Sequence, residues 1–510
     1  MKRISNGNQS VGSQIPGMAS LAERSASCGC RGPGPVSRRE FLATSGLGLG
    51  TIALSQLLAQ EGRAESTLPA AGAPSVSANP LAPRAPSLKA QARNVILLFM
   101  QGGASHVDTF DPKPELARFD GKSLPESFKS DDLFLQFMKA SDGKLMASPF
   151  PFKKHGASGL EISDLFPNLA RHADDLAVIR SCHHESFIHG PALSLLHSGS
   201  LLLGHPSVGS WVVYGLGSET RSLPAYMVMT DGDLRISSSA YSSGFLPAVF
   251  QGTLVRAEGV PIQNLSPPAQ LPLAAQRRLL DQIGVWNARH ARERPGDSRL
   301  DARIANYELA FRMQTAAPEL IHIADEPEHV RELYGIDREP TARFGRMCLF
   351  ARRMVERGVR FVQLYSSDWD GHGDCPGNHE KNAAKTDRPI AGLIADLKQR
   401  GLFDSTLIVW TGEFGRTPVM QGNRGRDHSP YGFSTWMAGG GIKGGRAFGQ
   451  TDDFGFRAVE DKMHVHDLHA TMLSLLGLEH EKLTYLFEGR RRRLTDVGGE
   501  NDLAEQLVSG

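Results

Sequence analysis

The sequence predicts an α/β fold built on a mostly parallel, doubly wound sheet with helices on both faces. Short apolar runs recur along the chain, helical stretches alternate with them, and the runs end in polar or Gly-rich loops. The first run, residues 93–100, is almost continuously apolar and is followed by Gln101, Gly102 and Gly103. Runs of this kind are typical of strands buried on both faces, as in a parallel sheet covered by helices.

The later elements follow in the order that such a fold requires. Strands are predicted at five further apolar runs, 177–181, 225–229, 360–365, 406–410 and 435–438. Helices are predicted before two of these runs and near the end of the chain, at 341–357, 384–400 and 466–476. Strands that alternate with helices favour parallel pairing, because each crossover helix returns the chain to the same edge of the sheet.

A long charged stretch interrupts this alternation. Between residues 232 and 340 the strand signal fades, and helical patterns such as 271–294 appear. We interpret this stretch as a helical insertion or cap on one domain that spans residues 91–510. In open α/β sheets the ligand site lies beyond the carboxyl ends of the strands, so the polar residues just after the predicted strands are the candidates for function.

The first 90 residues have a different character. Residues 37–42 (SRREFL) pair two arginines with Phe-Leu, and the apolar stretch behind them, 46–59, is too short to span a bilayer. This pattern predicts a twin-arginine signal peptide over residues 1–64, and the alternative is a buried N-terminal helix. An Ala/Pro/Ser-rich segment at 65–90 predicts a disordered linker. We therefore expect the twin-arginine translocase as an export partner, a location in the periplasm or cell envelope, and no integral membrane span.

Composition and cysteine usage exclude some classes of protein. The 510-residue chain has a formal net charge of +1, so no overall field would attract nucleic acid. The arginine run at 490–493 is interpreted as a solvated surface rather than a nucleic-acid site. Cys182, Cys348 and Cys375 follow the leader, and their odd number and wide spacing argue against a disulfide framework. A lone C-x-C at residues 28–30 is a weak metal signal.

The densest polar cluster follows the predicted strand at 360–365. Asp368, Asp370 and His372 lie within five residues of one another. Asp oxygen and His nitrogen suit Zn²⁺, and the carboxylates also suit Mg²⁺, Mn²⁺ or Ca²⁺. The cluster therefore predicts a divalent metal site, and the alternative is a polar turn with a surface histidine. His379, a few residues on, is either a further ligand or a solvated side chain.

A second polar group follows the predicted strand at 406–410. Glu413 leaves this strand and Arg416 comes three residues later. A carboxylate beside a guanidinium suits a metal ligand next to a group that holds an anion, and the alternative is a salt bridge that caps a helix. His428 follows beside basic residues, in a stretch without apolar periodicity.

Two more groups occupy the same kind of position. His106 and Asp108 follow the first predicted strand. Residues 182–191 contain four polar groups of site type and lead into a predicted helix at 192–198, whose N-terminus favours an anion. His189 lies just before this helix.

Together these segments resemble the alkaline phosphatase superfamily, which includes phosphatases, sulfatases and cofactor-independent phosphoglycerate mutases. The chain more closely resembles the bacterial family called domain of unknown function 1501, and this resemblance covers roughly residues 93–497. Five segments carry it: GGASHVDTFDPKPEL, HGPALSLLHSG, SVGSWVVYGLG, TLIVWTGEFGRTP and DHSPYGFSTWMAGGG. The resemblance implies an alkaline-phosphatase-like fold with a site for two metal ions.

The resemblance also implies roles for particular residues. The D-x-x-x-H pair of the superfamily falls on Asp368 and His372, and its final histidine falls on His428. One metal half-site therefore looks intact.

The other half of the superfamily pattern is altered. Gln101 stands where an Asp is expected, and Glu413 and Phe414 replace an Asp-His pair. His189 takes the position of the nucleophile. No C-x-P-x-R motif of the formylglycine sulfatases is present.

The favoured hypothesis is an exported, metal-dependent hydrolase of phosphate, sulfate or related esters, acting on a small-molecule or polysaccharide substrate. Asp368, His372 and His428 would hold the divalent metal ion, Zn²⁺ being the first expectation. His189 would act as nucleophile or general acid/base, and Arg416 would hold the anion.

His106, Asp108 and Glu413 would complete a rearranged second metal site. The main alternative is a degenerate relative that binds an anionic envelope ligand or polysaccharide without turnover, which the altered positions Gln101 and Phe414 favour. A further alternative is a structural envelope protein in which the clusters are polar loops.

Overall fold

The computed structural model describes residues 79–509, except for 129–134, 138, 140–141, 257–271 and 295–297. The predicted signal peptide lies outside the described residues. The described part of the predicted linker, 79–90, is held against the domain rather than forming a disordered tether. The Arg84 N–H donates to the Leu216 carbonyl, and the Leu88 N–H donates to the Gly477 carbonyl.

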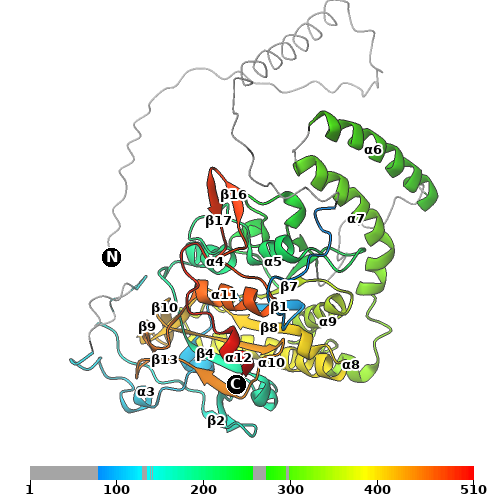
Figure 1. The fold of residues 1–510 in the computed structure, drawn as a ribbon. Coiled ribbons are helices and arrows are strands. Elements are labelled where there is room, and N and C mark those ends of the chain that lie inside the picture. Colours follow the sequence, from blue (N-terminus) through cyan, green and yellow to red (C-terminus); the bar gives the residue numbers. More distant parts are fainter. Residues whose placement is uncertain are drawn as a thin grey trace, which may run out of the picture. The chain divides into compact units, whose positions relative to one another are not determined.

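The centre of the fold is a nine-stranded sheet of order β12-β4-β11-β8-β1-β7-β5-β6, with β15 also paired to β4 (Figure 1). β1 lies parallel to β7 and β8, and β5 lies parallel to β7 and β6. β11 runs antiparallel to both of its neighbours, β4 and β8, so the other strands of this sheet share one direction. The nine strands are β1 (Asn94–Met100), β4 (Ala177–His183), β5 (Tyr226–Thr230), β6 (Thr253–Leu254), β7 (Phe361–Ser366), β8 (Thr406–Thr411), β11 (Phe433–Gly439), β12 (Arg446–Phe448) and β15 (Met463–His464).

Helices cover both faces of this sheet, which confirms the predicted doubly wound α/β fold. The side chains of Val95, Leu97 and Phe99 point to one face and belong to a buried cluster with side chains of several helices. Ile96, Leu98 and Met100 point to the other face, into a cluster with side chains of a different set of helices. β1 is therefore buried on both sides, which explains its unbroken apolar sequence. The first face carries α4 (His189–Ser198), α5 (Val208–Leu216) and α11 (Val465–Leu475), and the second carries α9 (Ala342–Glu356) and α10 (Cys375–Gln399).

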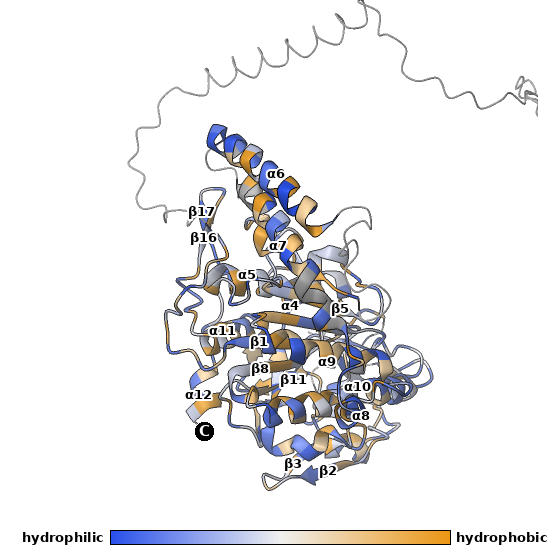
Figure 2. Cartoon of the chain, turned by 90° about the vertical axis from the view of Figure 1, so that its right-hand side faces the viewer, coloured by the Kyte–Doolittle hydropathy of each residue, from blue (hydrophilic) through white to orange (hydrophobic). Residues whose placement is uncertain are grey.

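The stretch 232–340 contains helices, as expected, and also completes the sheet. Its strand β6 forms one edge of the sheet beside β5. Among the described residues, α6 contacts α7, and α7 also reaches η4 and α9. Figure 2 shows α6 and α7 projecting beyond the layers that enclose the sheet. The helical elements of this stretch are η3 (Ser237–Tyr241), η4 (Ala248–Phe250), α6 (Leu273–Glu293), α7 (Ser298–Ile321) and α8 (Glu328–Tyr334).

Short elements surround the sheet. The connection from β8 to β11 is the β9–β10 hairpin, so Glu413 and Arg416 do not form a salt bridge that caps a helix there. Three other two-stranded pairs are β2 with β3, β13 with β14, and β16 with β17. Their bounds, with those of the remaining helices, are α2 (His106–Thr109), α3 (Pro114–Arg118), β2 (Phe152–His155), β3 (Leu160–Ser163), η2 (Leu169–Asp175), η5 (Phe403–Ser405), β9 (Gly415–Gln421), β10 (Gly425–Ser429), β13 (Gln450–Thr451), β14 (Ala458–Glu460), β16 (Tyr485–Phe487), β17 (Arg490–Arg492) and α12 (Ala504–Ser509).

This topology brings several loops to one edge of the sheet. β1, β4, β7 and β8 are parallel, so their carboxyl ends meet there. β11 runs the other way, so the residues that lead into it start from the same edge. In the described part of the chain, no helix is long and apolar enough to cross a bilayer.

Candidate metal centre

Four side chains converge at the carboxyl edge of the sheet. His189, Asp370, His372 and His428 each offer one ligand atom, and these four atoms lie within 4.8 Å of one another. His189 is the first residue of α4, shortly after β4, and Asp370 and His372 lie in the loop between β7 and α10. His428 lies on β10, just before β11. The described residues contain no second group of this kind.

The distances in the group fit a small metal ion. Asp370 Oδ2 lies 3.1 Å from Nε2 of His189, and Asp370 Oδ1 lies 3.0 and 3.3 Å from Nε2 of His372 and His428. The Nε2 atoms of His372 and His428 are 2.8 Å apart. A tetrahedral zinc site with bonds of about 2.0–2.1 Å would place its ligand atoms roughly 3.3 Å apart. Small outward movements of these side chains would therefore make room for the ion.

In each of the three histidines, Nδ1 points away from the group, and its hydrogen-bond partner indicates which ring nitrogen carries the hydrogen. Nδ1 of His428 lies 2.8 Å from the carbonyl oxygen of Phe187, and Nδ1 of His189 lies 2.7 Å from Oε1 of Glu413. Nδ1 of His372 lies 2.6 Å from Oε1 of Gln421. These partners are acceptors, so each Nδ1 donates a hydrogen bond.

In the neutral imidazoles, each inner Nε2 then carries a lone pair. Two lone pairs that face each other at 2.8 Å repel unless a cation lies between them. An outer acceptor that holds Nδ1–H and leaves Nε2 free is the usual arrangement around a metal-bound histidine. The donor set of three imidazoles and one carboxylate is well suited to Zn²⁺.

Two members of the group, Asp370 and His428, have the charge states of metal ligands. Burial opposes ionisation of Asp370, but hydrogen bonds from His189, His372 and His428 and the charge of Arg416 outweigh it and lower the pKa of this carboxyl well below its usual range. Burial lowers the pKa of His428 to about 4. Asp370 is therefore ionised and His428 neutral near pH 7, as metal ligands must be.

Burial opposes protonation of His189, but its hydrogen bonds to Asp370 and Glu413 outweigh it and raise its pKa, so a metal ion would have to displace that proton.

Two arginines donate hydrogen bonds to the carboxylate of Asp370. Arg416 donates to Oδ1 at 2.6 Å, and Arg235 donates to Oδ2 at 2.9 Å. Arg416 is wholly buried, and its other hydrogen bonds go to the carbonyls of Gly102, Gly103 and Arg426. Arg416 therefore positions Asp370 and does not present its guanidinium to an incoming anion, contrary to the sequence-based expectation.

Arg235 is the cationic side chain that reaches this centre from the surface. Its side chain is 37% exposed. It follows β5 at the same edge of the sheet, so a search of all strand ends could have found it.

Glu413 supports the centre instead of completing a second metal site. Its carboxylate accepts the hydrogen of His189 Nδ1 and also the Gly102 N–H, at 2.9 and 3.0 Å from its two oxygens. Gly102 has a φ of +116°, and a Cβ there would lie 2.5 Å from the backbone nitrogen of Asp370. The glycine is required because the loop after β1 passes directly against the loop after β7.

The structure corrects the expected ligand Asp368. Its φ of +79° turns the chain, its side chain is 59% exposed, and it pairs with Lys381 at 2.9 Å. Trp369 is buried between the two aspartates and donates its backbone N–H to the Gln101 carbonyl. The carboxylate that faces His372 is consequently Asp370.

His106 and Asp108 do not join the group. Asp108 forms a fully buried ion pair with Arg426, Oδ2 to Nε at 2.8 Å, and Ser105 donates to the same oxygen. Burial raises the pKa of Asp108, but Arg426 outweighs this and lowers it overall. Nε2 of His106 lies 2.8 Å from the Gly455 carbonyl. These residues fasten α2 to the β9–β10 hairpin and the loop after β13, so they do not form the expected second site.

His379 is neither a ligand of this group nor a solvated side chain. It is fully buried on α10, and its Nε2 accepts the backbone N–H of Ser105 at 2.8 Å.

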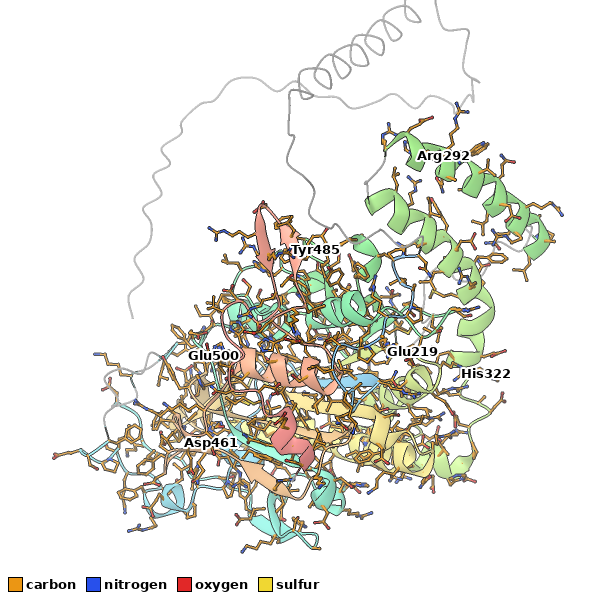
Figure 3. The ribbon with its side chains drawn as sticks, viewed as in Figure 1. Glu219, Arg292, His322, Asp461, Tyr485 and Glu500 are labelled. Atoms are coloured by element: carbon orange, nitrogen blue, oxygen red, sulfur yellow. The ribbon has the colours of Figure 1, made fainter. Side chains whose placement is uncertain are left out.

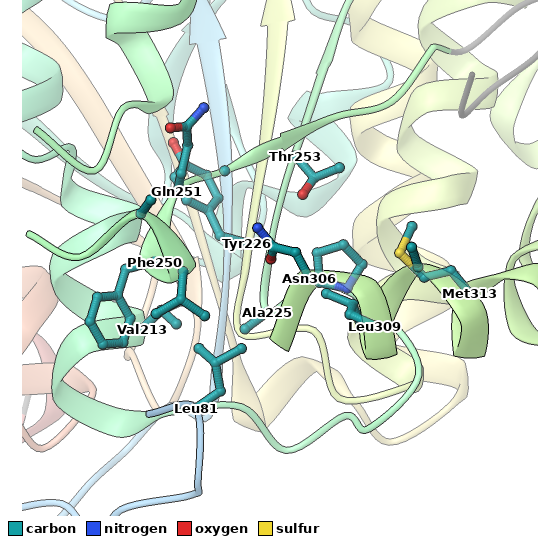
Figure 4. A pocket seen from close by; sticks show the side chains of 15 residues that line it. Leu81, Val213, Ala225, Tyr226, Phe250, Gln251, Thr253, Asn306, Leu309 and Met313 are labelled. Carbon is teal, nitrogen blue, oxygen red and sulfur yellow. The ribbon is translucent and has the colours of Figure 1, made fainter. Parts of the chain in front are cut away.

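A separate cavity of about 330 Å³ lies beside the first residues of β5 (Figure 4). Figure 4 shows Tyr226, Phe250 and Leu309 lining it, with α7 on one side. Its lining contains no His, Asp, Glu or Cys. The cavity lies at the opposite end of β5 from the candidate metal centre.

Fold and site together define an α/β protein with a candidate metal centre at the carboxyl edge of a mostly parallel sheet. The family model described as "Protein of unknown function (DUF1501)" matches residues 92–506, and the chain belongs to this family. A search of curated protein sequences gives no significant match.

The chain is also similar to solved structures of sulfatases and of the alkaline phosphatase superfamily. PsFucS1 sulfatase from Pseudoalteromonas sp. is 14% identical, with 76% of this chain and 68% of that chain covered and a TM-score of 0.34. A protein of the alkaline phosphatase superfamily from Vibrio parahaemolyticus is 9% identical, with coverages of 78% and 70% and a TM-score of 0.32. Phosphonate monoester hydrolase of Agrobacterium radiobacter is 11% identical, with coverages of 82% and 77% and a TM-score of 0.33.

Proposed function

We propose that this protein is a metal-dependent hydrolase of phosphate, sulfate or related esters that works with the single metal centre at His189, Asp370, His372 and His428. The observation that carries the proposal is the convergence of three Nε2 atoms and one carboxylate, each held from outside by a hydrogen bond. Zn²⁺ is the ion that this donor set fits best. The substrate is a small-molecule or polysaccharide ester.

A divalent ion at this site would supply Lewis acidity and activate water for attack on the ester. The protein contributes the geometry. Glu413 fixes the ring of His189, and Arg416 fixes the carboxylate of Asp370 from the buried side. Both ring nitrogens of His189 have partners, which favours attack by water over attack by this histidine.

Arg235 takes the role of holding the anionic group of the substrate. It lies beside Asp370 and is open to solvent, whereas Arg416 is enclosed. A guanidinium presents a planar pair of N–H groups that matches two oxygens of a phosphate or sulfate. Arg235 therefore favours anionic esters over neutral ones.

The first test is the metal content of the purified protein. We expect near-stoichiometric metal in the wild type, a loss in Asp370→Ala and His372→Ala, and retention in Asp368→Ala. Asp368 is a matched control because it has the same chemistry two residues away but pairs with Lys381 at the surface. Equal metal content in Asp370→Ala and Asp368→Ala would contradict the centre described above.

The second test is turnover of p-nitrophenyl phosphate, p-nitrophenyl sulfate and a phosphonate monoester by the metal-loaded protein. We expect hydrolysis that is lost in Asp370→Ala, and a KM raised at least tenfold in Arg235→Met with unchanged metal content. Stoichiometric metal and anion binding without turnover of any ester would instead support the alternative, a protein that binds an anionic envelope ligand or polysaccharide.

We also propose that the twin-arginine signal directs the protein to the periplasm or cell envelope. The arginine pair at residues 38–39 and the apolar stretch behind it support this. Arg38→Lys/Arg39→Lys should leave the protein in the cytoplasm. Export of this variant at the wild-type level would refute the proposal.

A further inference from the structure

One end of the molecule exposes apolar side chains on three separate elements, and two of these elements also carry exposed arginines. In both Figure 1 and Figure 2, α6 and the β16–β17 hairpin project at the same end. Figure 3 shows Arg292 on α6 and Tyr485 on β16 at this end. The third element is the loop after α4, which contains Leu202 and Leu203.

Helix α6 leaves an apolar stripe uncovered. Arg277 pairs with Glu308 of α7 and marks the side that faces this neighbour. Leu279 and Trp286 are 51% and 63% exposed. They are seven residues apart, which places them on one side of the helix two turns from each other. No described residue of α6 is buried.

Arginines flank this stripe. Arg278 and Arg289 are both exposed, and their spacing of three turns places them on one side of α6. Over its whole length α6 has four arginines and two acidic residues. A basic helix with an exposed Trp and Leu has the composition of segments that lie in a membrane interface.

The β16–β17 hairpin repeats the combination. Leu486 in the middle of β16 is 66% exposed and stands opposite Arg491 on β17. The hairpin is anchored, because the ring of Phe487 stacks on Phe245 at 4.8 Å. The exposure of Leu486 therefore belongs to a fixed part of the surface and not to a loose turn.

The leucine loop lies beside the hairpin. Leu202 and Leu203 are 71% and 62% exposed. The ring of His205, two residues on, lies 5.6 Å from Phe245, which in turn stacks on the hairpin. Contiguous exposed apolar patches with a polar rim are typical of sites that bind a membrane or another protein.

We propose that this end of the molecule, consisting of α6, the β16–β17 hairpin and the leucine loop at 201–203, docks onto a lipid bilayer with anionic headgroups. Trp286, Leu486 and the loop leucines enter the boundary between headgroups and acyl chains. The exposed arginines Arg278 and Arg289 of α6 and Arg490 and Arg491 of β17 contact headgroup phosphates. Charge favours this partner over a second copy of the chain, because a symmetric pair docked through this face would bring the arginines of both copies together.

The experiment is flotation of the purified protein with vesicles of phosphatidylethanolamine and phosphatidylglycerol (70:30), beside vesicles of pure phosphatidylcholine. We expect binding to the anionic vesicles alone, weakened by high salt. Trp286→Ser/Leu486→Ser should weaken binding at least tenfold. Arg490→Gln/Arg491→Gln should weaken it about thirtyfold, since each arginine near an anionic surface contributes about one factor of five.

A spectroscopic signal reports the contact directly. Four of the five tryptophans of the chain are buried, and Trp286 is the exposed one. Its fluorescence should shift to shorter wavelength with anionic vesicles and not with phosphatidylcholine.

The matched control is Val459→Ser/Arg118→Gln, which removes an exposed apolar and an exposed basic side chain on other elements, β14 and α3, and should bind as the wild type does.

Three results would overturn the proposal. The first is no binding to anionic vesicles at low salt. The second is binding that the Trp286→Ser/Leu486→Ser variant leaves unchanged, which would indicate attraction to any polyanion. The third is dimerisation in sedimentation that this variant abolishes in the absence of vesicle binding, which would assign the face to a second copy. None of these readouts depends on catalysis, so they stand apart from the proposed hydrolase activity.

Discussion

Replacing Asp370 by Asn tests the charge network of the metal centre. The amide keeps the size of the side chain but removes the negative charge that faces Arg416 at 2.6 Å and Arg235 at 2.9 Å. We expect this variant to be less stable without metal and to gain nothing from Zn²⁺.

The magnitude follows from what surrounds Arg416. Breaking a buried ion pair costs about 3–5 kcal/mol, because one charge stays buried without its partner. Arg416 keeps three backbone carbonyl acceptors, and Asp370 is 19% exposed, so the lower end of this range applies. With an unfolding entropy of about 2.1 cal/mol/K per residue, a loss of about 3 kcal/mol lowers the Tm of a domain of this size by about 3 °C.

Asp368→Asn is the matched control. Its carboxylate pairs with Lys381 at the surface, where both side chains are more than half exposed, and such pairs contribute little to stability. We therefore expect its Tm to equal that of the wild type.

Differential scanning calorimetry, first with a chelator and then with Zn²⁺, measures both effects. A ligand at about one hundred times its Kd stabilises a folded protein by about 2.7 kcal/mol. The wild type and Asp368→Asn should show this gain, and Asp370→Asn should not. If Asp370→Asn and Asp368→Asn had the same Tm with chelator and the same gain with Zn²⁺, the network described here would be wrong.

Three other predictions concern the support of the site and the core. Gly102→Ala should destabilise the protein by more than about 1 kcal/mol in urea unfolding. The reason is that φ of Gly102 is +116° and the added Cβ meets the backbone of the facing loop. A variant as stable as the wild type would contradict this. Glu413→Gln should lower zinc affinity about 10–100-fold in a chelator competition titration, because it weakens the acceptor for the Nδ1 hydrogen of His189. Unchanged affinity would show that Glu413 does not support His189 as a ligand. Burial lowers the pKa of His197 and His469 from 6.5 to about 3, so between these pH values the unfolded chain binds more protons than the folded one. Stability should therefore fall as the pH drops, by about 2 kcal/mol per histidine from pH 7 to pH 5, and equal stability at both pH values would contradict the burial of these rings.

The architecture was open to prediction because its signals are local. An unbroken apolar run such as residues 93–100 reports burial on both faces wherever it lies in the fold. The edge of the sheet that holds the site was also open to prediction, since parallel strands bring their carboxyl ends together. That rule placed His372 and His189 among the candidates, and the resemblance to the superfamily pointed to His428.

The identity of the fourth member of the group was not open to prediction in the same way. Asp368 and Asp370 are chemically equivalent and two residues apart in one loop. Only the positive φ of Asp368 and the buried ring of Trp369 decide that Asp370 faces the histidines. A loop that leaves a strand has no fixed period, so spacing taken from a family pattern does not determine side-chain direction there.

Long-range packing decided the remaining roles. The sequence by itself determined the α/β fold, the positions of the main strands and helices, and the edge of the sheet where site residues collect, because apolar periodicity and strand polarity are local properties. Tertiary structure alone decided that Arg416 turns inward to Asp370, that Arg235 reaches the centre from the insertion, and that Asp108 is enclosed with Arg426. Each of these contacts joins residues far apart in the chain, and the direction of a charged side chain follows from which partner lies within reach once the backbone has folded.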